Sequence, residues 1–433
     1  MRMTTTIAAV EGFRIWDSRG RPTVEVEVTL ADGSVGRGIA PAGASRGSRE
    51  AVDLRDGGPM AGGYGVNRAV HNVNEIIGPA LLGLDAREQA TIDQRLCELD
   101  PSATKATLGG NALIATSMAT LMAAAHSAGL PLWRYLAGAQ AVRMPLPQIQ
   151  IFGGGAHAGR RVDIQDFLVM PIGAESFDEA LAICADIYRV AGELMDKRGC
   201  RFGVADEGGW WPAFDSNEDA LKTLTEAINV AGHEGRAMIA LDIAASEFGR
   251  NGRYRLGLEA REFDTDGWLA QLCEWIERYP ILSLEDPVAE DDDHGMRAFT
   301  AAMGQRIQII GDDYLVSNAQ LVRQAILDGA CNAALLKPNQ VGTISETFAA
   351  FKQAQTANWG TVVSARSGES EDVVITHLAI GWNAGQLKVG SFARSERMAK
   401  WNAGLRVERQ GSGITGYAGR GALPLAIRHR LER

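Results

Sequence analysis

Three carboxylates each follow a short, mainly apolar run in the second half of the sequence: Asp242, Glu285 and Asp312. If the runs are neighbouring strands, these side chains repel one another unless a cation neutralises them. Oxygen ligands without histidine or cysteine favour Mg²⁺ over Zn²⁺. The trio therefore predicts a magnesium site, although any one of these carboxylates alone could equally well cap a helix or form an ion pair.

Lys337 follows a further apolar run, Ala333 to Leu336. A partly desolvated lysine beside bound metal ions has its charged form disfavoured, so it can act as a base near neutral pH. Removal of a proton α to a carboxylate leaves an enolate-like species that metal ions can stabilise. These residues therefore suit proton abstraction followed by loss of a β-hydroxyl, but a lysine in an ordinary salt bridge could occupy the same position.

The elements that must position these residues repeat along the chain. After Glu285, polar residues close apolar runs at intervals of about 24 to 27 residues, enough for one strand and one helix. Repeats of this kind predict a parallel sheet, and this chain length favours a closed barrel, whose strand ends meet at one mouth. We therefore expect one pocket to contain Asp242, Glu285, Asp312, Lys337, Arg366, Ser367 and Lys388.

The first part of the chain has a different pattern. Alternating residues from Thr23 to Leu30 predict a half-solvated strand, and apolar spacing predicts helices over 66–82 and 111–128. The character changes near Met144. We expect an α/β protein with an α+β domain over residues 1–141 and a β/α barrel over residues 142–433.

Composition limits the partners and the compartment. The net charge of −10 over 433 residues argues against nucleic acid or an anionic membrane as the main partner, but not against a small anionic substrate. The five cysteines are scattered without a CxxC pair, and the N-terminal residues lack the apolar core of a signal peptide. The apolar stretch from Leu113 to Leu130 contains polar residues, which favours a buried helix over a membrane span. We expect a cytoplasmic protein.

Many short strings resemble those of the enolase family and occur in the family's order. Examples are Ser283-Leu284-Glu285-Asp286-Pro287 and Leu336-Lys337-Pro338-Asn339-Gln340. Further matches lie at residues 17–25, 43–45, 154–159, 165–167, 206–209, 311–313, 366–369 and 393–397. The resemblance implies a hydro-lyase with an enolase-type β/α barrel, an N-terminal α+β capping domain and two Mg²⁺ ions. It also implies a homodimer or a larger homo-oligomer.

The resemblance also implies a role for each matching residue. Asp242, Glu285 and Asp312 would hold the first Mg²⁺, and Ser45 would help to hold the second. Lys337 would be the general base, and Glu207 the acid that protonates the departing hydroxyl. The other implied roles are binding of the substrate carboxylate by Lys388, binding of its phosphoryl group by Arg366 and Ser367, and lining of the pocket by His157 and Gln165.

Three positions in the pocket depart from the family pattern. Arg46 stands where the mobile loop usually has threonine, Ala365 replaces a histidine, and Asp166 replaces a glutamate of the catalytic network. Loss of the histidine makes room beside Arg366, and Arg46 adds a planar cationic donor. These changes favour a larger anionic substrate, with both Arg46 and Ala365 beside it.

The substrate hypothesis that follows is a carboxyphosphono analogue of 2-phosphoglycerate. On this hypothesis the chain resembles carboxyphosphonoenolpyruvate synthase, which acts in phosphinothricin-type antibiotic biosynthesis. The first alternative is an ordinary 2-phosphoglycerate enolase (phosphopyruvate hydratase) of glycolysis, in which the three departures are neutral. The second alternative is a catalytically inactive scaffold, which has no physical need for the metal carboxylates or for Lys337.

Overall fold

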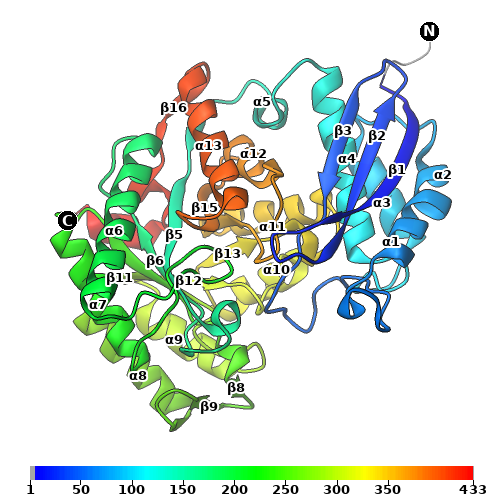
Figure 1. The fold of residues 1–433 in the computed structure, drawn as a ribbon. Helices are drawn as coiled ribbons and strands as arrows, with labels where there is room; N and C mark the ends of the chain where they lie inside the picture. The colour runs from blue at the N-terminus through cyan, green and yellow to red at the C-terminus, as the bar shows by residue number, and fades with distance from the viewer. Residues whose placement is uncertain (1–4, 433) are drawn as a thin grey trace.

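The structure is a computed structural model that describes residues 5–432. Its N-terminal part contains an antiparallel sheet in the order β1 (Ile7–Trp16), β2 (Pro22–Leu30) and β3 (Val35–Ile39) (Figure 1). Along β2, from Val24 to Leu30, buried residues alternate with partly exposed ones, which confirms the predicted half-solvated strand. Alternation of this kind arises because successive side chains point to opposite faces of a strand.

Helices form the rest of this N-terminal part. They are α1 (Asn67–Asn72), α2 (Gly78–Leu81), α3 (Gln89–Leu99), α4 (Gly110–Ser127) and α5 (Leu132–Ala137), and a single π-helical segment (Val73–Ile77) joins α1 to α2. The long helix α4 packs directly on β2 and β3, and nearly all its side chains are buried. It fulfils the prediction of a buried helix.

A closed eight-stranded barrel forms the rest of the core. Its strands are β5 (Leu146–Gly153), β6 (Asp166–Met170), β7 (Met238–Asp242), β11 (Ile281–Glu285), β12 (Gln308–Gly311), β13 (Ala333–Leu336), β14 (Gly360–Ser364) and β15 (Gly385–Ser391). The closed barrel and the α+β N-terminal part confirm the expected α/β class.

One strand differs from the expected all-parallel arrangement. β6 runs antiparallel to both of its neighbours, β5 and β7. The connection between β5 and β6, residues 154–165, contains only a short 3₁₀ turn (Gly155–Ala158) and no helix that could cross over the barrel. Because β6 is reversed, its first residue, Asp166, pairs with the last residue of β7, Asp242, at the same mouth.

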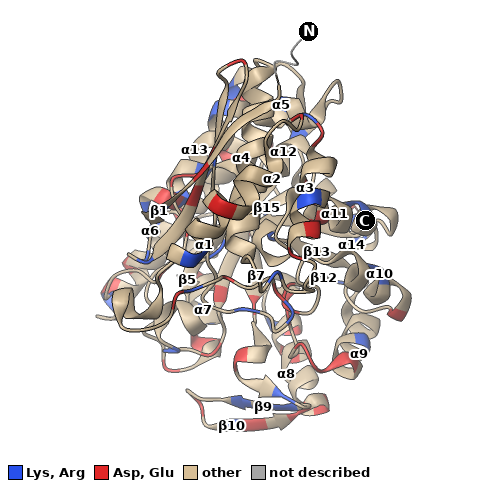
Figure 2. Cartoon of the chain, turned by 90° about the vertical axis from the view of Figure 1, so that its right-hand side faces the viewer, with Lys and Arg blue, Asp and Glu red and all other residues tan. Residues whose placement is uncertain are grey.

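Helices surround the barrel. They are α6 (Phe177–Lys197), α7 (Asn217–Val230), α8 (Thr265–Arg278), α9 (Asp293–Met303), α10 (Ala319–Asp328), α11 (Ile344–Thr356), α12 (Val374–Gly381), α13 (Ser395–Gln410) and α14 (Leu425–Leu431). Two short sheets lie outside the barrel: β8 (Gly249–Arg250) with β9 (Arg253–Leu256) and β10 (Arg261–Asp264), and β4 (Val142–Met144) with β16 (Ile414–Tyr417). In the view of Figure 2, acidic and basic residues are interspersed over the outer elements.

Polar side chains fill part of the barrel interior. Gln386 of β15 exchanges hydrogen bonds of 2.8 and 3.0 Å with Gln308 of β12, which is not its neighbour in the sheet. Gln148 of β5 donates to the same Gln386 oxygen at 2.9 Å. Buried amides need such partners, because an unsatisfied polar group in the interior is costly. The network therefore connects strands across the barrel.

α5 ends at Ala137 and β4 begins at Val142, so the division expected at 141/142 falls directly before β4. β4 pairs with β16, close to the end of the chain. The division at 141/142 stays a prediction, and residues 1–4 and 433 lie outside the described residues. Among the described residues, no helix combines the length and the apolar character needed to cross a membrane.

Gly38 of β3 lies close against the backbone of α4. A Cβ atom at Gly38 would lie 2.4 Å from the carbonyl oxygen of Ala115 and 2.7 Å from the amide nitrogen of Ala119. We predict that Gly38→Ala lowers the free energy of unfolding by about 1–3 kcal/mol, because the backbone of α4 must shift to admit a methyl group. Denaturant unfolding followed by circular dichroism measures the loss.

The matched control is Gly421→Ala, whose added methyl group meets only a terminal nitrogen of Arg143, at 3.2 Å. This control should unfold within about 0.5 kcal/mol of the wild type. Equal stability of Gly38→Ala and the wild type would contradict the close packing of β3 on α4.

Candidate active site

A small cavity opens at the mouth of the barrel. The predicted site residues that line it are Ser45, His157, Gln165, Asp166, Glu207, Asp242, Lys337, Ala365, Arg366, Ser367 and Lys388. Ser364, Val389 and Gly390 complete the wall of the barrel, and Gly43 comes from the N-terminal part. The structure thus brings together side chains that are more than 300 positions apart in the sequence.

Lys388 lies at the centre of a group of buried carboxylates. Its Nζ atom is 2.8 Å from Asp242, 2.9 Å from Glu285 and 3.3 Å from Asp166. Burial opposes the charge of this lysine, but the three carboxylates outweigh burial and raise the pKa of Lys388 well above its usual value. The ammonium group therefore offsets part of the repulsion among these acids.

Lys337 makes a comparable contact with the third predicted metal ligand. Its Nζ atom donates to Asp312 at 2.5 Å, and Gln340 donates to the other oxygen of Asp312 at 2.7 Å. Burial alone would lower the pKa of Lys337, but the neighbouring carboxylates, Asp312 and then Glu285, together raise it. The lowered pKa expected for a lysine base is therefore not seen in this arrangement, because its closest neighbour is an anion.

The carboxylates at the mouth fit a hard divalent cation. One oxygen of Glu285 is buried without a hydrogen-bond partner among the described residues. Burial, together with repulsion from Asp242, raises the pKa of Glu285 well above its usual value. A buried, unpartnered oxygen in a group of crowded carboxylates is the environment that a Mg²⁺ ion would relieve.

Two other groups of side chains bring their potential metal-ligand atoms closest to one another. Within residues 5–432, groups of three acidic or histidine side chains with ligand atoms within 4.8 Å of one another are His157–Asp166–Glu207 and Asp286–Asp312–Asp313. Asp242, Glu285 and Asp312 do not form such a group, and the two lysines lie against their oxygens. Asp286 accepts from the backbone amides of Asp312 and Asp313 at 2.8 and 2.7 Å, so it fixes the turn that carries Asp312.

Glu207 and Asp166 flank His157 on another side of the cavity. Nε2 of His157 lies 3.7 Å from an oxygen of each. Burial raises the pKa of Asp166. Burial also opposes ionisation of Glu207, but positive charge at His157, Arg397 and Lys388 outweighs it and lowers the pKa of Glu207. Two neighbouring acids whose pKa values shift in opposite directions are typical of a catalytic site.

Arg366 provides the cationic side of the cavity. The side chain is 3% exposed and forms a bidentate ion pair with Glu50, with bonds of 2.9 and 3.2 Å. It also donates to Asn339 at 3.1 Å and to the carbonyl oxygen of Ser45 at 3.1 Å. A guanidinium held in this way is a rigid donor for a phosphoryl group.

Buried charges also hold the backbone around Arg366. Arg397 is fully buried and donates to the carbonyl oxygens of Arg366 and Ser367 at 2.7 and 2.5 Å. Glu369 accepts from the amide of Arg366 at 2.8 Å and pairs with Lys400 at 3.0 Å. The anion-binding segment is therefore fixed from behind as well as through its side chain.

The loop from the N-terminal part reaches this segment directly. The amide of Ala44 donates to the hydroxyl of Ser367 at 2.7 Å. A side chain at Gly43 would collide with Arg366, because a Cβ atom there would lie 1.9 Å from Nη2. Arg46 lies farther along the loop, is exposed and does not line the cavity.

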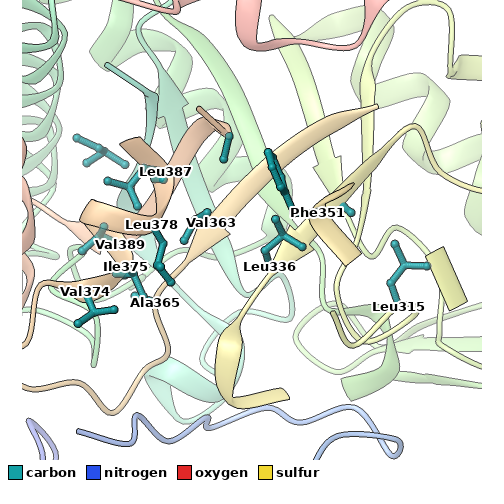
Figure 3. Close-up of a cluster of buried hydrophobic side chains, with 14 of the residues drawn as sticks. Leu315, Leu336, Phe351, Val363, Ala365, Val374, Ile375, Leu378, Leu387 and Val389 are labelled. Carbon is teal, nitrogen blue, oxygen red and sulfur yellow. The ribbon is translucent and has the colours of Figure 1, made fainter. Parts of the chain in front are cut away.

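Ala365 belongs to the apolar wall behind the cavity. Its side chain is 7% exposed and lies beside Val374, Ile375 and Val389 (Figure 3). The small residue therefore continues the hydrophobic packing between the barrel strands and α12 on one side and borders the cavity on the other.

Glu50, Gln340 and Asp286 are among the residues at this site that had no role in the sequence-based prediction. Gln340 lies in the same enolase-like string as the predicted base Lys337, and Asp286 directly follows the predicted metal ligand Glu285. Their closeness in sequence to predicted site residues could have indicated them. Glu50 had no such signal. Its contact at the site is with Arg366, which lies 316 positions away in the sequence.

Comparison with known proteins agrees with this geometry. Residues 7–136 match the enolase N-terminal domain, and residues 141–424 match the enolase C-terminal TIM barrel domain. A protein named Enolase 1 from Desulfitobacterium hafniense (strain Y51) is 47% identical over 425 residues, which cover 97% of each chain.

This full-length similarity shows that the carboxyphosphono substrate hypothesis is wrong. That hypothesis placed the chain in phosphinothricin-type antibiotic biosynthesis on the basis of three departures, at Arg46, Ala365 and Asp166. The departures are single substitutions. They do not outweigh the 47% identity to a protein named Enolase 1, which extends along both domains. The chain belongs to the enolase family of hydro-lyases.

Proposed function

We propose that this chain is an ordinary enolase that removes water from 2-phosphoglycerate to give phosphoenolpyruvate. The observation that carries the proposal is that Lys337 and Glu207 border one cavity together with Arg366. A base, an acid and a phosphoryl-binding cation are the groups that this elimination requires.

The proposed elimination begins with transfer of the proton α to the substrate carboxylate to Nζ of Lys337 in its neutral form. Mg²⁺ held by Asp312 would favour that form, because it would neutralise the anion that raises the pKa of this lysine. Lys388 stabilises the additional negative charge on that carboxylate. Glu207 then donates a proton to the β-hydroxyl, which leaves as water. The negative charge of a bound substrate raises the pKa of neighbouring acids, which offsets the lowering of the Glu207 pKa. Asp166 and His157 lie beside Glu207 and support this proton transfer.

The proposed metal ligands are Asp242, Glu285 and Asp312 for one Mg²⁺ and Ser45 for a second. Such ions supply positive charge that stabilises the enolate-like species. The proposal is supported by the oxygen-only donor set and by the unpartnered buried oxygen of Glu285. We also propose a cytoplasmic homo-oligomer, as is usual in the family, and the small cavity favours a single anionic substrate.

Turnover of 2-phosphoglycerate tests the proposed function directly. We expect purified protein with Mg²⁺ to form phosphoenolpyruvate, measured by the absorbance of the product, with a kcat in the usual range of about 1–10³ s⁻¹. Complete absence of turnover by folded protein would contradict the proposal.

Variants of Lys337 and Glu207 should separate the two proton transfers. Lys337→Met should lower kcat by about 10²–10⁴-fold and abolish exchange of the α-proton of 2-phosphoglycerate with solvent deuterium. Glu207→Gln should lower kcat similarly but retain exchange, because the base is intact. Nuclear magnetic resonance measures the exchange. Lys352→Met, a change of an exposed lysine on α11, is the matched control and should behave like the wild type.

Mg²⁺ should stabilise the wild type against heat. Binding at 100 times the dissociation constant adds about 2.7 kcal/mol of stability, so a rise in Tm of several degrees is expected by calorimetry. Asp242→Asn should lose most of this rise, whereas Glu262→Gln, on the exposed strand β10, should keep it. An unchanged Tm and inactivity of the wild type in Mg²⁺ would instead support an inactive scaffold.

A further inference from the structure

Glu50 is a buried acid of the N-terminal part that contacts the barrel. Its side chain is 5% exposed, and both of its oxygens accept hydrogen bonds from Arg366. One of them also accepts from the amide of Gly47, at 3.2 Å, within the loop that carries Ser45. This carboxylate therefore joins the loop to the anion-binding arginine.

Glu50 occupies two of the hydrogen-bond donors of Arg366. A guanidinium group has five N–H donors. Nη1 donates to Glu50 and Asn339, and Nη2 donates to Glu50 and the carbonyl oxygen of Ser45. These bonds engage the four Nη protons and fix the plane of the guanidinium. The position of the fifth donor, Nε–H, is thereby fixed as well. This donor has no hydrogen bond to the described residues.

Glu50 also connects to the other half of the site. Gln340 donates to Glu50 at 3.3 Å and to Asp312 at 2.7 Å, and Asp312 in turn accepts from Lys337. The hydroxyl of Ser317 donates to the side-chain oxygen of Gln340 at 2.6 Å, which fixes the orientation of this amide. A continuous chain of hydrogen bonds therefore runs from the loop through Glu50 to the proposed base.

The charge of Glu50 matters as much as its position. Burial alone would destabilise the Arg366 cation, but Glu50 outweighs burial and raises the pKa of Arg366. Removal of one partner of a buried ion pair leaves the other charge uncompensated. Without Glu50, Arg366 would keep only its bonds to Asn339 and to the carbonyl oxygen of Ser45, and its guanidinium would be held less firmly.

We propose that Glu50 is a positioning residue that orients Arg366 for the phosphoryl group of the substrate and couples this orientation to the loop that carries Ser45. The inference rests on the proposed function for the identity of the substrate. Glu50 does not line the cavity and acts through Arg366.

The test compares anion binding by Glu50 variants. Glu50→Gln keeps the size of the side chain but loses its charge, and it should raise the KM for 2-phosphoglycerate and the Ki of inorganic phosphate by about tenfold or more, with kcat within about threefold. Glu50→Asp keeps the charge but is one methylene shorter, and it should give intermediate values. Tm measurements establish that each variant is folded.

The matched control is Glu290→Gln. Glu290 accepts from the amide of Ser48 in the same loop, at 3.1 and 3.3 Å, but has no contact with Arg366. This control should leave the KM and the phosphate Ki within about twofold of the wild type. A loss of phosphate affinity in Glu290→Gln equal to that in Glu50→Gln would assign the effect to docking of the loop and overturn the proposal.

Two further outcomes would overturn the proposal. A lower Tm of Glu50→Gln with unchanged KM and phosphate Ki would show a purely structural ion pair. Tighter phosphate binding by Glu50→Gln would show that Glu50 competes with the anion for Arg366.

Calorimetric titration with inorganic phosphate in Mg²⁺ needs no turnover. It separates the failure of this inference from the failure of the proposed function. If the protein does not convert 2-phosphoglycerate but Glu50→Gln binds phosphate more weakly than the wild type, the positioning role is supported. Only the proposed identity of the substrate is then contradicted. A wild type that binds no phosphate would overturn the positioning role itself.

Discussion

Mutual repulsion among buried carboxylates is the constraint on which the mouth of the barrel depends. Asp166, Asp242 and Glu285 all lie within 3.3 Å of the single ammonium group of Lys388. Because buried charges persist only when they are paired, every element that delivers one of these side chains must be held in register with the others. The closed barrel provides this register through its strand pairing, as between Asp242 and Glu285.

The two parts of the chain share the site. Strands of the barrel and the segments that connect them supply the other acids and both lysines, whereas the loop of the N-terminal part supplies Ser45 and Glu50. Glycine at position 43 lets the loop backbone approach Arg366 more closely than any larger residue would allow. The anion-binding side of the site is therefore built between the two parts, and the proton-transfer side lies within the barrel.

Much of this arrangement could be predicted from the sequence. Apolar runs that end in Asp242, Glu285, Asp312 and Lys337 indicated strands with a common mouth, because parallel strands end at one edge. The reversed direction of β6 was not predicted, since an apolar pattern has no direction and the short connection 154–165 was not taken into account. The three departures from the family pattern were overinterpreted, and Arg46, on which the substrate hypothesis relied, is exposed.

The sequence by itself determined the residue types, their spacing and the order of the strings, and these suffice for the barrel, the family and the identity of the chemical groups. Local patterns record which face of an element is buried, because burial follows the period of a strand or helix. Only the tertiary structure decided which distant charges meet. The pairing of Glu50 with Arg366 and the position of Lys388 among three acids arise from closure of the barrel and docking of the loop, and neither has a signature in the neighbouring sequence.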